Sequence, residues 1–416
     1  TDKPVLDADG NKVLDADGKE TTENVLSTLL FCPQRKAGST TVTVPDTVTN
    51  VAANAFYYNQ VVTEIRFGVL KKGETLTVGS QAFGSCAVLA KIALPEGLSE
   101  IPASMFYGCQ TVEEIVIPST VASIGNKAFF GCSNLKSLIF TETPEGQTPV
   151  DLVILDTPNG SSNNGYTNSP FYGCTSLKNI VLPERLTVIG RLAFGGLVSG
   201  RYGEKYIPPF ESISLPSTLK EIHEMAFLNA RNLKTVTFAS GTTLSDACDG
   251  KAFAIGKQAF YYCTSLTEIA LPTSSEATYS IGDTAFAYTG LKEISIPKAV
   301  GWLGSGVFNR SSDLAKVVFE AGANPKCGTS LFAYTAVSGV TLPEGVEAIS
   351  DYMFQGCVNL TSVTVPASVK SIGISAFESC QALAKVTFAT YEKDGKSYSN
   401  LISIDNYAFS KTGITS

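Results

Sequence analysis

The stretch VASIGNKAFFGCSNLKSL, residues 121–138, returns in altered form as VKSIGISAFESCQALAKV at residues 369–386. The two copies share Val, Ser, Ile, Gly, Ala, Phe, Cys and Leu at the same offsets. Most of the shared side chains pack rather than react, so the agreement predicts that each stretch is one turn of a structural repeat.

The repeat extends through most of the chain. The shortest intervals between copies are 22 to 24 residues, and larger intervals are this unit plus an insertion. The insertions lie near residues 141–169, 195–209, 239–256 and 389–404. Aligned on the Phe of Ala-Phe or its equivalent, the fourteen copies fall at Phe56, Phe83, Phe106, Phe129, Phe171, Phe194, Phe227, Phe260, Phe286, Phe308, Phe332, Phe354, Phe377 and Phe409.

Each unit contains one clear strand signal. In LAKIALP (residues 89–95) and VEEIVIP (112–118), apolar residues alternate at period two, as in a strand with one buried face. Pro ends the strand because it has no N–H for the ladder, and a Gly after the next Ile allows a tight bend. One such unit cannot bury its own core, so the units must stack. We therefore predict an α/β-class solenoid of about fourteen rungs of ~23 residues, with a parallel β-sheet on one face and irregular or short helical return segments.

Composition limits the functional classes. The 416 residues are 44% hydrophobic and 17% charged, and the net charge of −7 argues against nucleic acid, which selects a basic face. No run of 18 apolar residues is present, so no transmembrane segment is predicted. The chain opens at Thr1 without Met, and we expect that a leader was removed or that the sequence was trimmed.

The ten cysteines follow the repeat instead of forming a disulfide framework. Regular placement predicts a repeated buried site for a small apolar side chain, occupied by free thiols. Only Cys32, Cys248 and Cys327 fall outside the pattern. The other seven each lie three residues after a repeat Phe, at Cys86, Cys109, Cys132, Cys174, Cys263, Cys357 and Cys380.

A slower period overlies the repeat. Every third strand ends in Phe instead of Pro, as at Phe140 and Phe388, and most insertions follow these strands. The pattern is consistent with functional loops that project at intervals along one edge. It is equally consistent with descent from a triplicated unit without functional meaning.

The unit L-x-x-I-x-I-P-x-x-V-x-x-I-G-x-x-A-F-x-x-C resembles the BspA-type (Treponema-type) leucine-rich repeat family of bacterial cell-surface proteins, over about residues 40–416. The segment LLFCPQRKAGSTTVTVPDTV (29–48) is similar to the entry segment that precedes the first full repeat. We thus expect an N-terminal extension and cap at 1–39 and a solenoid at 40–416. The resemblance implies a right-handed leucine-rich-repeat solenoid, export to the cell surface and adhesion or recognition, but it supplies no ligand and no catalytic residue.

Catalytic and metal signals are weak. The single histidine, His223, stands where other units have Gly, and we interpret it as a turn variant without a catalytic or ligand role. No catalytic motif occurs, so we predict no enzyme activity and no cofactor. Two VLDADG copies carry oxygen ligands at a spacing that suits calcium, but they lack the length and terminal Glu of an EF-hand. Asp-Gly turns are the preferred interpretation, with a calcium site as the alternative at Asp7, Asp9, Asp15 and Asp17.

Two surfaces are candidate binding sites. The first is the outward side of the strands, where the column before the central Ile or Val carries three Lys and three Glu. The second, which we call the aromatic ridge, could stack on sugars or anchor a protein, or could simply pack with its hydroxyls in water. It lies one and two residues after the repeat Phe, at Tyr57, Tyr58, Tyr107, Phe130, Tyr172, Tyr261, Tyr262, Tyr288 and Tyr334.

These observations predict a non-enzymatic bacterial cell-surface leucine-rich-repeat protein. We expect adhesion to, or recognition of, a protein or glycan of a host or microbial surface through the solenoid face and its loops. The alternative is a structural spacer or surface-layer component without a specific ligand. The sequence pattern places the start of a fifteenth strand at Ile414. We therefore expect the C-terminal edge to be capped by another chain or truncated. An open edge of this kind would allow self-association there.

Overall fold

The computed structural model describes residues 2–4, 22–24, 28–32, 40–71, 73–156, 168–196, 206–246, 253–273, 278–394 and 396–414. The chain consists of two compact units, Thr1–Val150 and Asp151–Ser416. The four aspartates of the VLDADG copies, Cys248 and parts of all four insertions lie outside the described residues. The expected boundary between a cap and a solenoid at residue 39 stays a prediction.

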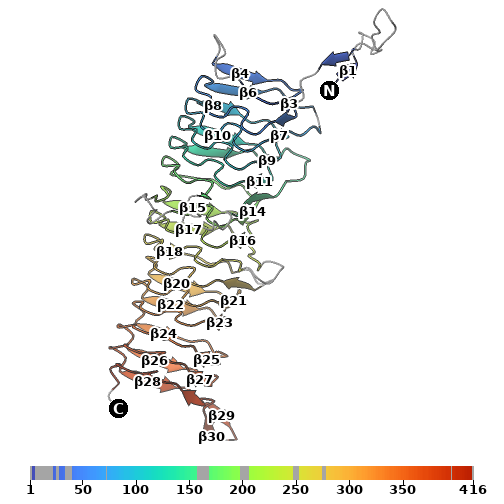
Figure 1. Cartoon of the computed structure of the whole chain (residues 1–416). Helices are drawn as coiled ribbons and strands as arrows, with labels where there is room; N and C mark the ends of the chain where they lie inside the picture. Colours follow the sequence, from blue (N-terminus) through green and yellow to red (C-terminus); the bar gives the residue numbers. More distant parts are fainter. Residues whose placement is uncertain are drawn as a thin grey trace, which may run out of the picture. The chain divides into compact units, whose positions relative to one another are not determined.

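The predicted strands form a parallel sheet in each unit, which we call the front sheet. In the first unit it contains β4 (Thr41–Val44), β6 (Glu64–Phe67), β8 (Lys91–Ala93), β10 (Glu114–Ile117) and β12 (Ser137–Phe140), stacked in chain order (Figure 1). The second unit has β15 (Ser212–Leu215), β17 (Thr235–Phe238) and β18 (Glu268–Ile269), then β20 (Glu293–Ile296), β22 (Lys316–Phe319), β24 (Gly339–Thr341), β26 (Ser362–Val365) and β28 (Lys385–Phe388). The predicted solenoid with parallel strands is therefore confirmed.

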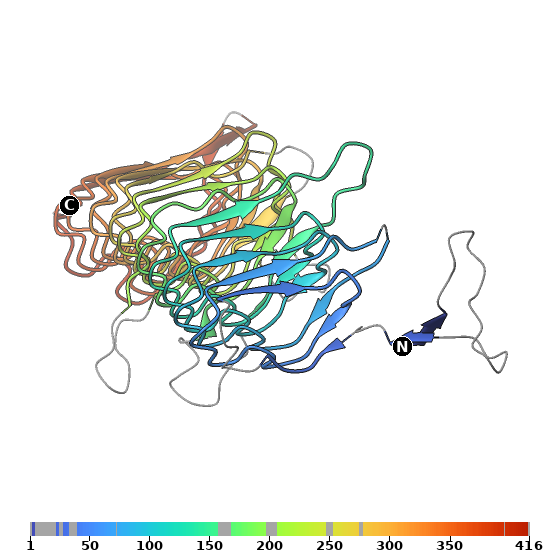
Figure 2. The same cartoon turned by 90° about the horizontal axis from the view of Figure 1, so that it is seen from above.

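A second row of short parallel strands, the side sheet, replaces the expected irregular or helical returns. In the first unit it contains β3 (Thr28–Leu29), β5 (Asn50–Val51) and β7 (Thr77–Val78), and separately β9 (Glu100–Ile101) with β11 (Ser123–Ile124). Figure 2 shows the two rows in the strands coloured blue to teal. In the second unit the row contains β13 (Leu152–Ile154), β14 (Leu186–Ile189), β16 (Glu221–Ile222), β19 (Tyr279–Ile281), β21 (Val300–Leu303), β23 (Lys326–Cys327), β25 (Ala348–Ile349), β27 (Ser371–Ile372) and β31 (Ser403–Ile404).

The prediction of short helical returns is wrong for the described residues, which contain no α-helix and so no helix able to cross a membrane. Most side-sheet strands have only two or three residues, too few to show an alternating pattern in the sequence. The remaining strands are two antiparallel pairs. β1 (Asp2–Pro4) pairs with β2 (Thr22–Asn24), and β29 (Tyr391–Lys393) pairs with β30 (Lys396–Tyr398) in the insertion near 389–404.

The repeat phenylalanines form the core of each unit, which we call the Phe column. In the first unit Phe106 and Phe129 are fully buried and their rings stack at 5.6 Å with an interplanar angle of 8°. In the second unit Phe227 and Phe260 stack at 4.9 Å with an angle of 4°. Each ring is covered by the rings above and below it, which explains why a single rung cannot be stable alone.

The chain around each column Phe forms what we call the outer turn, from two residues before the Phe to two after it. Gln258 and Tyr262, at the two ends of one outer turn, have φ of 56° and 61°. The N–H groups of Gln258, Phe260 and Tyr262 all donate to carbonyls of the next rung, at 2.8 to 3.1 Å. Asn54, Phe56 and Tyr58 in the first unit do the same. The three donors are alternate residues of the turn, and the N–H of Tyr261 between them bonds within the turn to Gln258 O.

The predicted burial of the seven cysteines is confirmed, and all seven are free thiols. Their description as small apolar side chains is incomplete, because the Sγ–H groups donate hydrogen bonds. Cys109 Sγ donates to the carbonyl of Phe83 at 3.0 Å, and Cys263 Sγ to that of Phe227 at 3.2 Å. Ser311 occupies the same position and donates to Phe286 O at 2.9 Å. At these positions a small donor binds the Phe carbonyl of the preceding rung, whereas Thr289 and Thr335 at the same offset donate to the Phe carbonyl of their own rung and Ala230 has no side-chain donor.

Candidate binding surfaces

The outward side of the front sheet in the second unit is shallow and chemically mixed. Two hollows lie on it, of about 780 Å³ over β22, β24 and β26 and about 520 Å³ over β18, β20 and β22. Lys316 and Val318 line both. Lys316 Nζ pairs with Glu293 Oε2 at 3.1 Å, while Val318 is 40% exposed. The two hollows are lined by one Lys and by Glu268, Glu293, Glu320 and Glu344, so the surface combines exposed apolar area with an excess of acidic side chains.

The larger hollow exists because one strand lacks a side chain. Gly339 begins β24 between Lys316 of β22 and Ser362 of β26. A Cβ placed on Gly339 would meet no atom within 4 Å, so the space above it is open. Thr341, Thr364 and Ser362 add hydroxyls to the lining, and Glu320 and Glu344 add carboxylates. The lining therefore offers hydroxyls, carboxylates and one ammonium to a ligand, with no arrangement of nucleophile and base among these residues.

The aromatic ridge divides into members with different environments. Tyr57, Tyr58 and Tyr334 are exposed, while Tyr107 and Phe130 are half-buried and stack on each other at 4.9 Å. Tyr172 is buried against Tyr206, with ring centroids 4.6 Å apart, so it presents little surface to a ligand. Tyr206 comes from the insertion near 195–209 and donates its hydroxyl to Phe171 O at 3.0 Å. It supplies the donor that a cysteine supplies elsewhere.

The other ridge residues in the second unit gather around two arginines. Tyr261, Tyr262 and Tyr288 form one cluster, in which the Tyr262 and Tyr288 rings stack at 4.4 Å with an angle of 8°. Arg231 lies over Tyr262 at 5.5 Å, and Arg310 lies 6.0 Å from the Tyr288 ring and 4.5 Å from that of Tyr334. A pattern of aromatic residues alone misses both arginines, although Arg310 stands at the same offset as Tyr288 and Tyr334.

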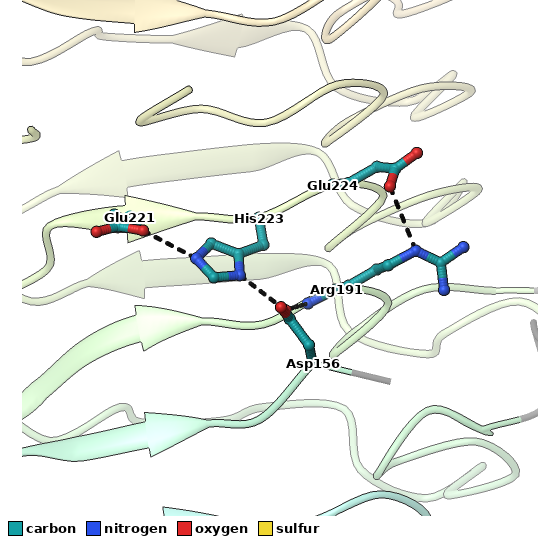
Figure 3. A network of polar contacts seen from close by, with 5 residues as sticks. All are labelled: Asp156, Arg191, Glu221, His223 and Glu224. Atoms are coloured by element: carbon teal, nitrogen blue, oxygen red, sulfur yellow. Dashed lines mark hydrogen bonds and ion pairs between the residues drawn. The ribbon is translucent and has the colours of Figure 1, made fainter. Parts of the chain in front are cut away.

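The histidine takes part in a polar network on the side sheet. Figure 3 shows the His223 ring between two carboxylates, with Nδ1 2.7 Å from Asp156 Oδ1 and Nε2 2.9 Å from Glu221 Oε2. Asp156 Oδ1 also accepts the backbone N–H of Arg191 at 2.6 Å. The Arg191 side chain in turn pairs with Glu224, Nε to Oε2 at 3.4 Å. His223 is therefore held by two carboxylates, and its interpretation as a turn variant without a catalytic or ligand role stays a prediction.

The strand register explains how His223 reaches so far along the chain. Ile154, Ile189 and Ile222 are aligned on three consecutive side strands, so Gly190 lies between Asp156 and His223 on the intervening rung. Gly190 has no side chain to block the path. His223 and Asp156 are 67 residues apart in the sequence. Their contact joins the insertion near 141–169 to the rung of β16, two rungs further along.

The two carboxylates change the titration of the imidazole. The hydrogen bond that His223 donates to Asp156 raises the pKa of His223, and the one to Glu221 adds to this effect, although burial alone would lower it. Burial opposes ionisation of Asp156, but its bonds to His223 and the Arg191 N–H prevail and lower its pKa. With both ring nitrogens facing carboxylates, the imidazolium donates on both sides. The arrangement is a charged clamp, and within the described residues no cluster of acidic, Cys and His side chains could hold a metal ion.

The family follows from comparison with known repeats. A model of the BspA type leucine rich repeat region matches residues 34–146, 158–202, 205–248, 247–359 and 325–416. The chain belongs to the BspA-type leucine-rich repeat family. The resemblance seen in the sequence is thereby confirmed. None of the curated proteins compared with the chain matches it.

The fold is shared with a solved structure from Bacteroides ovatus. That leucine-rich repeat protein is 25% identical over 83% of this BspA-type chain and 73% of its own, with a TM-score of 0.50. Two further structures match with lower scores. A leucine rich cell surface protein from Faecalibacterium prausnitzii is 21% identical over 91% and 93% of the two chains, with a TM-score of 0.37. A leucine-rich repeat protein from Eubacterium ventriosum is 22% identical over 85% and 84%, with a TM-score of 0.41.

Proposed function

We propose that this BspA-type protein is a non-enzymatic recognition protein of the bacterial cell surface. It binds a protein or glycan of a host or microbial surface through the front sheet of its second unit and the loops beside it. The observation that carries the proposal is the open surface over β18–β26, with its two hollows and mixed chemistry. Shape and composition of this kind suit a macromolecular ligand better than a small one, because the hollows are shallow and wide.

The chemistry of the surface supports binding rather than catalysis. Lys316 pairs with Glu293, and the other charged lining groups are the carboxylates of Glu268, Glu320 and Glu344. The rest of the lining consists of Ser and Thr hydroxyls and apolar side chains. The only histidine lies on the side sheet and is held by two carboxylates. Membership of the BspA-type family supports a surface location.

The proposal can be tested by binding the purified chain to arrays of matrix proteins and glycans. Gly339→Lys fills the larger hollow, and the strand should tolerate it because the space above Gly339 is open and its φ is not positive. Asn134→Lys is the matched control, with the same side chain added at an exposed turn of the first unit. We expect at least one array ligand to be lost with Gly339→Lys and kept with Asn134→Lys.

The alternative is a spacer without a specific ligand, which is the other function predicted from the sequence. A chain that binds no array ligand above background, or whose binding survives Gly339→Lys unchanged, would exclude recognition through this surface. Thermal melting of both variants keeps the result interpretable, since the two should melt close to the parent protein.

A further inference from the structure

The outer turns of four consecutive rungs in the second unit, together with one arginine of the preceding rung, carry a continuous stack of side chains. Arg231, four residues after Phe227, begins the stack, and Tyr262, Tyr288, Arg310 and Tyr334 of the outer turns continue it; we call it the Arg–Tyr stack. Guanidinium planes favour the negative faces of aromatic rings, so each arginine is held by the rings beside it. The stack ends at Gly356 of the next rung, where a Cβ would lie 2.5 Å from the Tyr334 ring.

The backbone under the stack favours glycine. The residue two places after the column Phe has positive φ in these rungs, 61° at Tyr262, 57° at Tyr288, 57° at Arg310 and 58° at Tyr334. Elsewhere the same position is filled by Gly108, Gly131 and Gly356. Bulky side chains at such φ values cost free energy that glycine does not. The fold therefore does not require Tyr or Arg at these positions, which points to a use for the side chains themselves.

Stacking decides which atoms remain available to a ligand. The faces of Tyr262 and Tyr288 are covered by each other and by the arginines, which leaves no open ring face for a sugar. The ring edges with their hydroxyls and the edges of the guanidinium groups remain. Arg310 and Tyr334 are exposed, and Tyr262 and Tyr288 are half-buried.

The two guanidinium groups lack a compensating charge. Among the described residues no carboxylate lies within ion-pair distance of either, and Arg231 Nε donates instead to the neutral Asn229 Oδ1 at 2.6 Å. Column rings on these rungs are 4.9, 5.1 and 5.8 Å apart, so Arg231 and Arg310 stand about 15 Å apart, as expected for three rungs. In a chain of net charge −7, two such fixed cations form a distinct site.

We propose that the Arg–Tyr stack binds an extended acidic peptide segment of a partner protein, which rests on and deepens the proposed recognition function. A guanidinium edge pairs with a carboxylate in a bidentate manner, and Arg and Tyr are the residue types that dominate protein-binding energy. In an extended peptide, side chains four residues apart face the same way and are separated by about 13 Å. Two carboxylates at that spacing reach Arg231 and Arg310, and the tyrosine hydroxyls between them bind the peptide backbone.

The test uses the full chain and a fluorescein-labelled twelve-residue peptide of Ser and Thr with glutamate at its fourth and eighth positions. We expect saturable binding, weakened by salt, in fluorescence anisotropy. A twin peptide with glutamine at both positions should bind at least about tenfold more weakly. Arg310→Gln should cause a similar loss, and Arg310→Lys a large part of it, because Lys keeps the charge without the planar, bidentate edge.

Controls separate this site from the front sheet. Lys316→Gln removes the same charge from the front sheet and should leave peptide binding unchanged, whereas Gly339→Lys tests the proposed function independently. Arg231→Gln, at the other end of the stack, replaces Arg310→Gln if that variant does not fold. Equal binding of the two peptides, or binding that survives both arginine variants, overturns the proposal. Arginine-dependent binding of a uronate-bearing oligosaccharide without peptide binding overturns it as well.

Discussion

The Phe column and the Arg–Tyr stack lie on the same rungs but differ in how far their residue types are fixed by packing. In the column, each rung of the second unit from Phe171 to Phe409 supplies a phenylalanine to one unbroken series of stacked rings. Two residues further along, the outer position varies among glycine, Ser, Asn, Lys, Arg and Tyr, with positive φ in most rungs. The column is imposed by packing, because a buried ring cannot be replaced without a cavity. The outer position is free to vary, so its large residues carry information about function.

The strongest test of this contrast is Phe260→Ala. Emptying a large buried aromatic site costs about 3–5 kcal/mol, and neighbouring rungs lose their cover at the same time. We expect a large drop in the free energy of unfolding, measured by urea denaturation followed by circular dichroism. If the urea midpoint stayed within experimental error of the parent, Phe260 would not be a core residue. The proposed difference between the Phe column and the outer position would then be wrong.

The cysteine position tests whether the inner side of the rung selects volume or hydrogen bonding. Cys263→Ala removes the donor to Phe227 O and some volume, which should cost about 1–2 kcal/mol. Cys263→Ser keeps a donor and should cost less, as the native Ser311 indicates. The same urea titration measures both. A serine variant less stable than the alanine variant would contradict the donor role.

Native thiol labelling supplies a second measurement of the same position. Burial raises the pKa of Cys86 to about 11 and that of Cys380 to about 12, so little thiolate is available at neutral pH. We expect the seven repeat cysteines to stay unmodified until denaturant is added. Rapid labelling of most of them in the native protein would show that the position is open to solvent.

The histidine clamp on the side sheet should show a smaller effect that depends on pH. Because the folded pKa of His223 is raised, its contribution is fully present below about 6.5, the unfolded value, and is lost as pH rises through the folded pKa. His223→Gln should therefore lower the melting temperature more at pH 6 than at pH 8.5, with a largest effect of about 1 kcal/mol for this partly exposed group. Equal losses at the two pH values would show that the charge of the clamp does not matter.

The smallest effect is expected in the outer turn itself. Tyr262→Gly removes a stacked ring worth about 0.5–1.5 kcal/mol but also relieves the positive φ, so the two effects nearly cancel. The free energy of unfolding should change by less than about 1 kcal/mol, while binding of the acidic peptide weakens. A loss as large as that of Phe260→Ala would mean that the stack is part of the core.

Residues that recur at fixed offsets in the repeat could be predicted from the sequence. Residues whose role depends on a contact between distant segments could not. The front strands and the buried thiols follow from fixed offsets, since every copy restates the same constraint. Asp156 follows β13, which is in register with β14 and β16, but it lies within the long insertion near 141–169, where the repeat is hard to recognise from the sequence, so the sequence did not pair it with His223. Arg310 was missed for a different reason. A search for aromatic residues at this offset passes over an arginine, although Arg310 packs on the Tyr334 ring.

The one-way hydrogen bonds of the outer turn give each rung a donor side and an acceptor side. The N–H groups of Gln258, Phe260 and Tyr262 meet carbonyls of the next rung, as those of Asn54, Phe56 and Tyr58 do in the first unit. Any rung can therefore follow any other without a mismatch, whereas a reversed rung would set donors against donors. When a whole repeat is gained or lost, the rungs on either side still present donors to acceptors. A gene for such a chain can therefore lengthen or shorten by recombination while the protein still folds.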